Sequence, residues 1–172
     1  ISLMENSAQQ NAILNDIVFN DLKVSCITRN SQIIEHKFVC PEGTNASEQG
    51  ILEAFEKNEF KLLYQPVISL KDEQIHGFEA LIRWDRNNVI ISPDEFIPIL
   101  ENSMFITRLG NWIADEASRQ LKAWQDEFDT AKSLHININL SPRQFEDPNL
   151  CGSIYDIISK NGILPGNIGI EV

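Results

Sequence analysis

Two apolar segments separated by a short polar loop constrain the fold of this chain more than any other feature of its sequence. They occupy residues 60–66 and 75–84, and both have the length and composition of β-strands. The loop between them centres on residues 71–74, whereas a parallel crossover needs about a dozen residues or more. The two strands are therefore predicted to pair in antiparallel orientation.

Two serine-proline pairs mark the beginnings of helical segments. The sequence SPDE at 92–95 predicts a helix with serine as N-cap, proline in the first turn and a capping box closed by the glutamate. The sequence SPRQ at 141–144 repeats this start with an amide in place of the acid. We therefore expect one helix to begin at each position.

Helices and strands alternate in the second half of the chain. Apolar residues spaced three and four apart predict a long helix over 109–128. Strict alternation predicts a strand over 135–140, followed by an amphipathic helix near 150–158 and another strand at 168–172. This order implies the right-handed parallel units of an α/β barrel or a layered sheet.

The composition is that of an acidic globular domain. The net charge is −11, from 14 Lys and Arg against 25 Asp and Glu. This charge argues against binding of a nucleic-acid polymer or an anionic membrane surface, which needs clustered positive charge. Cys26, Cys40 and Cys151 are widely spaced, which indicates reduced thiols rather than a zinc site. Without an apolar run of membrane-spanning length, we expect a cytoplasmic domain, either free or within a membrane-anchored parent protein.

Oxygen-bearing side chains lie near the ends of three predicted strands. Glu79 and Arg83 share one face of the second strand because side chains alternate, Asn139 ends the third strand, and Glu171 lies in the last. In β/α barrels the active site lies at the carboxyl ends of the strands. Oxygen ligands without Cys or His suit Mg²⁺ or Mn²⁺.

Each of these residues also has an ordinary structural interpretation. Glu79 beside Arg83 is compatible with a surface ion pair. Asn139 is compatible with a brace for the following helix start, and Glu171 with a carboxylate that merely ends a strand. Spacing alone therefore predicts a barrel fragment and leaves its function open.

Six ordered stretches in residues 59–172 resemble the EAL family. They are YQPV at 64–67, GFEALIRW at 77–84, SPDEFIP at 92–98, LGNWI at 109–113, NLSPRQF at 139–145 and IEV at 170–172. The second stretch contains the triplet that names the family. The resemblance implies an α/β fold, a truncated TIM-like β/α barrel whose first strand pair is antiparallel.

The resemblance also implies a role for each candidate residue. Members of the family hydrolyse cyclic di-GMP to pGpG with Mg²⁺ or Mn²⁺. Glu79 matches the motif glutamate that ligates the metal and is required for catalysis, and Asn139 and Glu171 match the next two ligands. Arg83 matches the arginine that contacts a substrate phosphate, and Gln65 matches a glutamine that lines the ligand groove. We expect the three ligands to converge on one pocket with Arg83 at its rim.

Two departures limit what the resemblance implies. After residue 98 the family usually continues with small and acidic residues and a Thr-Gly pair, but this chain reads ILENSM at 99–104. The family's paired aspartates, catalytic lysine and last glutamate are expected beyond residue 172. The 172 residues alone are therefore expected to be inactive.

The alternative to an active parent enzyme is an EAL-type receptor or signalling scaffold that binds cyclic di-GMP without cleaving it.

The domain organisation follows from the extent of the resemblance. Residues 59–172 are the expected N-terminal half of an EAL domain, and residues 41–58 a polar linker with a short helix. Residues 1–40 resemble the end of a GGDEF diguanylate cyclase domain, and a remnant of an unrelated sensor is the alternative. The expected partners are cyclic di-GMP, a second EAL domain in a homodimer, and the upstream sensor or GGDEF-like domain.

Overall fold

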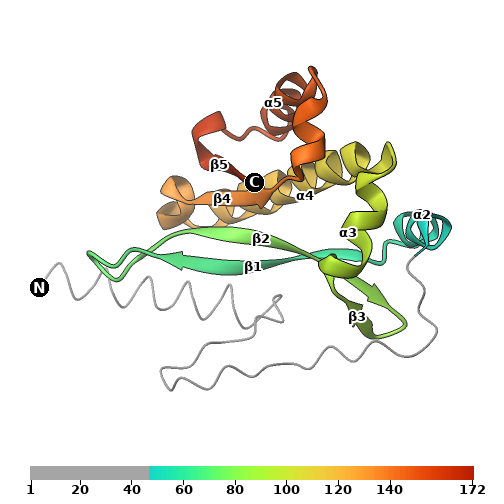
Figure 1. Ribbon diagram of the computed structural model, residues 1–172. Helices are drawn as coiled ribbons and strands as arrows, with labels where there is room; N and C mark the ends of the chain where they lie inside the picture. The colour runs from blue at the N-terminus through green and yellow to red at the C-terminus, as the bar shows by residue number, and fades with distance from the viewer. Residues whose placement is uncertain (1–46) are drawn as a thin grey trace, which may run out of the picture.

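The computed structural model describes residues 47–172, so the expected GGDEF-like or sensor remnant lies outside the described residues. Figure 1 shows a twisted sheet with helices packed along one face. The elements, in chain order, are α2 (Glu48–Glu56), β1 (Phe60–Ile68), β2 (Ile75–Arg86), β3 (Val89–Ile91), α3 (Pro93–Glu101), α4 (Phe105–Glu127), η1 (Asp129–Ser133), β4 (His135–Asn139), η2 (Pro142–Glu146), α5 (Leu150–Lys160), η3 (Pro165–Asn167) and β5 (Ile168–Glu171).

The sheet is open and mixed, with strand order β1-β2-β4-β5 and β3 attached to β2. The β1–β2 pair is antiparallel, as the short loop predicts, with Gln65 opposite Glu79. The β2–β4 and β4–β5 pairs are parallel, as the helix–strand alternation predicts. The α/β class and the antiparallel first strand pair are therefore confirmed. The short strand β3, which forms a hairpin with β2, was not predicted.

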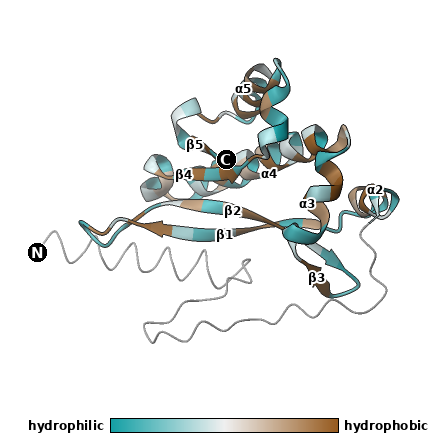
Figure 2. Ribbon diagram, in the orientation of Figure 1, coloured by the Kyte–Doolittle hydropathy of each residue, from teal (hydrophilic) through white to brown (hydrophobic). Residues whose placement is uncertain are grey.

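Alternation along the strands separates a buried face from an open face. Phe78, Ala80, Ile136 and Ile138 point toward the helices and are nearly inaccessible to solvent. The intervening residues of β2 and β4 point to the other face. Bands of brown and teal succeed one another along the strands in Figure 2. The sheet is thus fixed on one side by burial of apolar surface.

The long helix α4 packs on the buried face of the sheet and begins four residues before its predicted start. Its apolar stripe includes Leu109, Ile113 and Leu121, all buried. Trp124 contacts the rings of Tyr64 and Phe78 at centroid distances of 5.1 and 4.8 Å. These contacts confirm that the stripe forms the core.

The two serine-proline starts differ in the structure. Ser141 forms the capping box with Gln144, whereas the Ser92 side chain makes no capping hydrogen bond, so the capping box predicted at 92–95 is wrong. There the Glu95 N–H binds the Ser92 backbone carbonyl at 3.0 Å instead. The helix after Ser141 is only the short η2, because Asp147 is extended ahead of Pro148.

Candidate functional site

Four polar side chains form two hydrogen-bonded pairs on the open face of the sheet. The Asn139 side-chain amide donates to Glu79 Oε1 at 2.8 Å. The Asn137 amide donates to Glu171 Oε1 at 2.6 Å. In the strand register, however, Glu79 is opposite Asn137, and Asn139 is opposite Glu171. Both hydrogen bonds therefore run diagonally from β4, one to each neighbouring strand.

The burial of β4 dictates this arrangement. Ile136 and Ile138 are fully buried against the helices. Because successive side chains point to opposite faces, Asn137 and Asn139 must project onto the open face. A slip of one residue in register would bury both amides, so the apolar residues fix the direction of the polar ones.

Gly169 provides the room for one of the two pairs. A Cβ atom at this position would lie 2.3 Å from Asn137 Oδ1. That separation is far shorter than a van der Waals contact. A glycine at 169 therefore lets the Asn137 side chain lie across β5 and reach Glu171.

Arg83 lies four residues beyond Glu79, on the same face of β2. Its Nη1 donates to the Ile82 carbonyl oxygen at 2.7 Å, and the side chain is half-buried. Burial lowers the pKa of the Arg83 guanidinium, and the nearby Glu79 carboxylate opposes this shift. An arginine stays protonated at neutral pH despite such a shift. Arg83 therefore presents a fixed positive charge near the Glu79 carboxylate.

Gln65 is exposed on the same open face. It pairs with Glu79 across the antiparallel β1–β2 register. Facing residues in such a pair have Cβ atoms about 5 Å apart. The amide of Gln65 is therefore available to a ligand that lies over Glu79.

A pocket of about 290 Å³ opens where β2 and β4 separate, beyond their last pair at Ala80 and Ile138. Arg83 and Asn139 line this pocket, whereas Glu79, Gln65 and Glu171 do not. This pocket therefore holds one of the three candidate ligands, and their convergence on one metal ion stays a prediction. Asn139 joins the pocket to Glu79 through their hydrogen bond, while Glu171 lies beyond β4.

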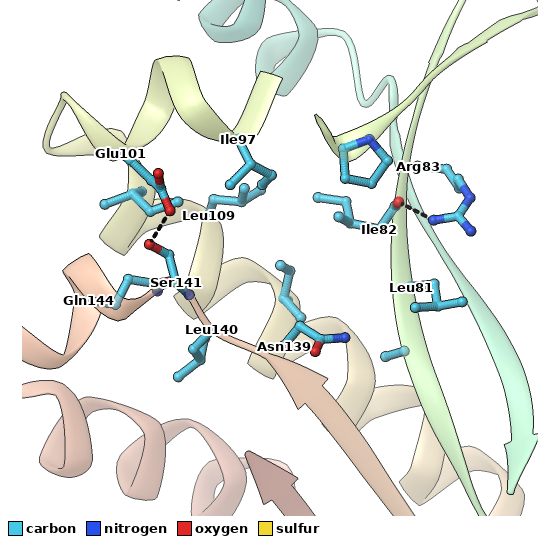
Figure 3. A pocket seen from close by; sticks show the side chains of 14 residues that line it. Leu81, Ile82, Arg83, Ile97, Glu101, Leu109, Asn139, Leu140, Ser141 and Gln144 are labelled. Carbon is cyan, nitrogen blue, oxygen red and sulfur yellow. Dashed lines mark hydrogen bonds between the residues drawn. The ribbon is translucent and has the colours of Figure 1, made fainter. Parts of the chain in front are cut away.

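The far wall of the pocket holds the turn that follows Asn139. Ser141 Oγ donates to Glu101 Oε1 at 2.6 Å, as Figure 3 shows, and the Ser141 N–H donates to Gln144 Oε1 at 3.0 Å. Gln144 is almost fully buried. Glu101 was not among the residues predicted from the sequence. The Ser-x-x-Gln spacing is the one signal that identifies Gln144.

The donor set fits a hard divalent cation in part. In the part of the chain that the structure describes, no three His, Cys, Asp or Glu side chains lie close enough together to hold a metal ion. The candidate ligands contain two carboxylates, Glu79 and Glu171, and the amide of Asn139. Carboxylate and amide oxygens are the donors that Mg²⁺ and Mn²⁺ prefer, and about six are needed. The open face therefore offers half of such a shell.

The family model described as the EAL domain matches residues 48–172. The bifunctional diguanylate cyclase/cyclic di-GMP phosphodiesterase MucR of Pseudomonas aeruginosa is 31% identical over 134 residues, which cover 74% of this chain and 19% of MucR. The signaling protein YkoW of Bacillus subtilis is 36% identical over 126 residues, which cover 73% of this chain and 15% of YkoW. The chain thus spans less than a fifth of either relative.

The solved structures agree with the sequence comparisons. The MucR phosphodiesterase in its cyclic di-GMP complex has a TM-score of 0.67 at 30% identity, over 72% of this chain and 50% of that one. The EAL enzyme Bd1971, bound to cAMP and cyclic di-GMP, has a TM-score of 0.66 at 34% identity, over 71% of this chain and 34% of that one. The open mixed sheet matches part of the β/α barrel of these proteins. No helix among residues 47–172 has the length and hydropathy needed to cross a membrane. The chain belongs to the EAL domain family, whose members are typically metal-dependent cyclic di-GMP phosphodiesterases.

Proposed function

We propose that the full-length protein hydrolyses cyclic di-GMP to pGpG and requires Mg²⁺ or Mn²⁺ to do so. Glu79, Asn139 and Glu171 would hold the ion. The observation that carries the proposal is that these three oxygen donors share one open sheet face, with the guanidinium of Arg83 near Glu79. Two of the solved relatives hold cyclic di-GMP, which supports the choice of substrate.

Each residue has a defined task in this reaction. A bound divalent ion supplies Lewis-acid polarisation of the phosphoryl group and lowers the pKa of water. Arg83 donates two parallel hydrogen bonds to the non-bridging oxygens of one phosphate, because its planar guanidinium matches their spacing. Gln65 binds the edge of the ligand over Glu79. Asn139 donates to Glu79 and so keeps that carboxylate turned toward the face where the phosphate binds.

The excess of negative charge in the chain makes Arg83 important for substrate binding. Cyclic di-GMP carries two phosphates, and a protein of net charge −11 repels them at long range. A half-buried arginine is screened less than an exposed one and therefore binds a phosphate more strongly. Charge reversal at this one position should weaken binding more than the same change on the surface.

The test is pGpG formation by the full-length protein with Mg²⁺ or Mn²⁺. Glu79→Gln replaces the carboxylate with a neutral amide of the same shape, and we expect this loss of negative charge at the metal to abolish hydrolysis. Glu127→Gln, at the exposed end of α4, is the matched control and should leave the rate unchanged. A wild-type protein that binds cyclic di-GMP tightly without forming pGpG would contradict the proposal and assign it to the receptor class instead.

A further inference from the structure

Asn137 occupies the centre of the two hydrogen-bonded pairs, although it was not among the residues singled out as ligands. It lies in the middle of β4, between Glu79 on β2 and Gly169 on β5 in the parallel registers. Its amide donates to Glu171 Oε1 at 2.6 Å, shorter than the usual N–H···O distance of about 2.9 Å. A hydrogen bond from an amide to an ionised carboxylate is of the stronger, charge-assisted kind.

Asn137 itself is held firmly, whereas Glu171 is not. The neighbours of Asn137 in the chain, Ile136 and Ile138, have no solvent exposure, so the backbone at 137 is anchored in the core. Glu171 is exposed at the end of β5, so protein packing restrains its side chain little. In the described part of the chain, the Asn137 amide is the only side chain that hydrogen-bonds Glu171. The hydrogen bond from the anchored Asn137 amide is therefore the main restraint on the Glu171 carboxylate.

The space for this contact is specific to residue 169. Any side chain there would collide with Asn137 Oδ1, because a Cβ atom would lie 2.3 Å away. The glycine leaves the Asn137 amide extended along the sheet face toward Glu171. The two strands are already joined by backbone pairing at four residue pairs. A hydrogen bond that only held β4 to β5 would therefore not need a residue without a side chain at 169.

We propose that Asn137 is a positioning residue that fixes the Glu171 carboxylate for a divalent cation shared with Glu79 and Asn139. This inference rests on the proposed function, because it assumes that Glu171 is a metal ligand. Side chains that hydrogen-bond a metal ligand typically contribute roughly 10- to 100-fold to metal affinity. Asn137 acts on the cation through Glu171, and removal of its amide leaves the ligand set itself unchanged.

The experiment is a double-mutant cycle on Mn²⁺ affinity in the full-length protein, measured by titration calorimetry at constant ionic strength. We expect Asn137→Ala to raise the Kd for Mn²⁺ by about tenfold. In a Glu171→Ala background, the same substitution should change the Kd by less than about twofold, because the side chain through which Asn137 acts is then absent. The control is Asn161→Ala, which removes an amide that donates to Asp115 Oδ1 at 2.9 Å, remote from the sheet face; it should leave the Kd unchanged.

Affinity and turnover separate the two proposals. Equal losses from Asn137→Ala in both backgrounds, or an unchanged Kd in a folded Asn137→Ala protein, would overturn the inference. A wild-type protein that binds no Mn²⁺ would overturn it too. If the wild type binds Mn²⁺ but forms no pGpG, the proposed hydrolysis fails, while the cycle still decides the role of Asn137. A thermal melt of each variant distinguishes a loss of affinity from a loss of folding.

Discussion

The Asn139 amide and the Glu79 carboxylate meet across the β2–β4 junction at 2.8 Å, although 60 residues separate them in the chain. Asn139 also lines the pocket beside β2. The Asn139 side chain therefore connects the Glu79 carboxylate on the sheet face with the pocket that opens where the two strands separate. A change at Asn139 should affect both.

We expect Asn139→Ala in the full-length protein to reduce pGpG formation at least 100-fold, because a candidate metal ligand and the partner of Glu79 are lost together. A higher Mn²⁺ concentration should restore part of the rate, because part of the lost activity comes from weaker metal binding. Rates measured over a range of Mn²⁺ concentrations test this. Asn149→Ala, at an exposed position before α5, is the control. A rate equal to that of the wild type would exclude Asn139 from the site.

Arg83→Lys keeps the positive charge but loses the planar fork that binds two phosphate oxygens. We expect the Kd for cyclic di-GMP, measured by calorimetry in Ca²⁺, to rise about tenfold, the equivalent of one charge-assisted hydrogen bond. Arg143→Lys is the matched control, because Arg143 is exposed and paired with Glu146 on the surface. Similar affinities for the Arg83 and Arg143 variants would show that Arg83 makes no forked contact.

Gly110→Ala should destabilise the domain even though alanine favours helices. A Cβ atom at 110 would lie 1.9 Å from Gln144 Nε2, and Gln144 is nearly fully buried. The displacement of Gln144 from its capping box costs about 1–3 kcal/mol, which exceeds a helix-propensity gain of up to about 1 kcal/mol. Chemical denaturation of single and double variants checks this.

Two further substitutions sharpen the Gly110 test. In a Gln144→Ala background, Gly110→Ala should no longer destabilise, because nothing large remains to be displaced. Gly152→Ala in α5 meets no atom within 4 Å and should raise the free energy of unfolding by up to about 1 kcal/mol. Equal effects at 110 and 152 would mean that the contact with Gln144 has no energetic consequence.

Tyr64 should make the domain less stable in alkali. Burial of its ring and the nearby Glu116 carboxylate raise the pKa of the Tyr64 hydroxyl well above its usual value of 10.0, although Arg119 opposes this shift. Above pH 10.0, the hydroxyl of Tyr64 loses its proton in the unfolded chain but keeps it in the folded chain. The stability present below pH 10 therefore declines as the pH rises further.

Tyr64→Phe tests this pH dependence. The Tyr64 hydroxyl has no hydrogen-bond partner among residues 47–172, so its removal should leave stability at pH 7 unchanged or raise it by about 1 kcal/mol. The variant should also unfold at a higher pH than the wild type. Tyr155→Phe, at an exposed tyrosine on α5, should not shift the alkaline transition. Melting curves between pH 7 and 11 measure both effects.

The 172-residue chain by itself should form no pGpG with Mg²⁺ or Mn²⁺ and should bind cyclic di-GMP weakly at most. Its three candidate oxygen ligands supply only half of the roughly six that these ions take. Parallel assays of this chain and of the full-length protein measure the difference. Turnover by the shorter chain would mean that the catalytic residues have been assigned wrongly.

The local sequence determines most of the elements and much of the site. The short polar loop before Ile75 dictates the antiparallel hairpin. The alternation of apolar and polar residues along the strands dictates which face of the sheet Glu79 and Asn139 occupy. These features are predictable because they depend on neighbouring residues. The capping box predicted after Ser92 is the exception. In the first turn of α3, the Glu95 N–H binds the backbone carbonyl of Ser92 instead of its side chain. The sequence pattern does not distinguish between these two ways of capping a helix.

Long-range packing decided the relationships between the elements. The sequence does not reveal that Asn137 and Asn139 reach diagonally to opposite neighbouring strands, that Gly169 makes room for one of these contacts, or that Glu101 meets Ser141 40 residues away. The first two contacts depend on the offset between strands, which follows from how Ile136 and Ile138 pack against the helices. The third depends on where the end of α3 lies relative to the turn after β4. A pattern along one segment determines the direction of a side chain. Only the packed sheet determines which other side chain it meets.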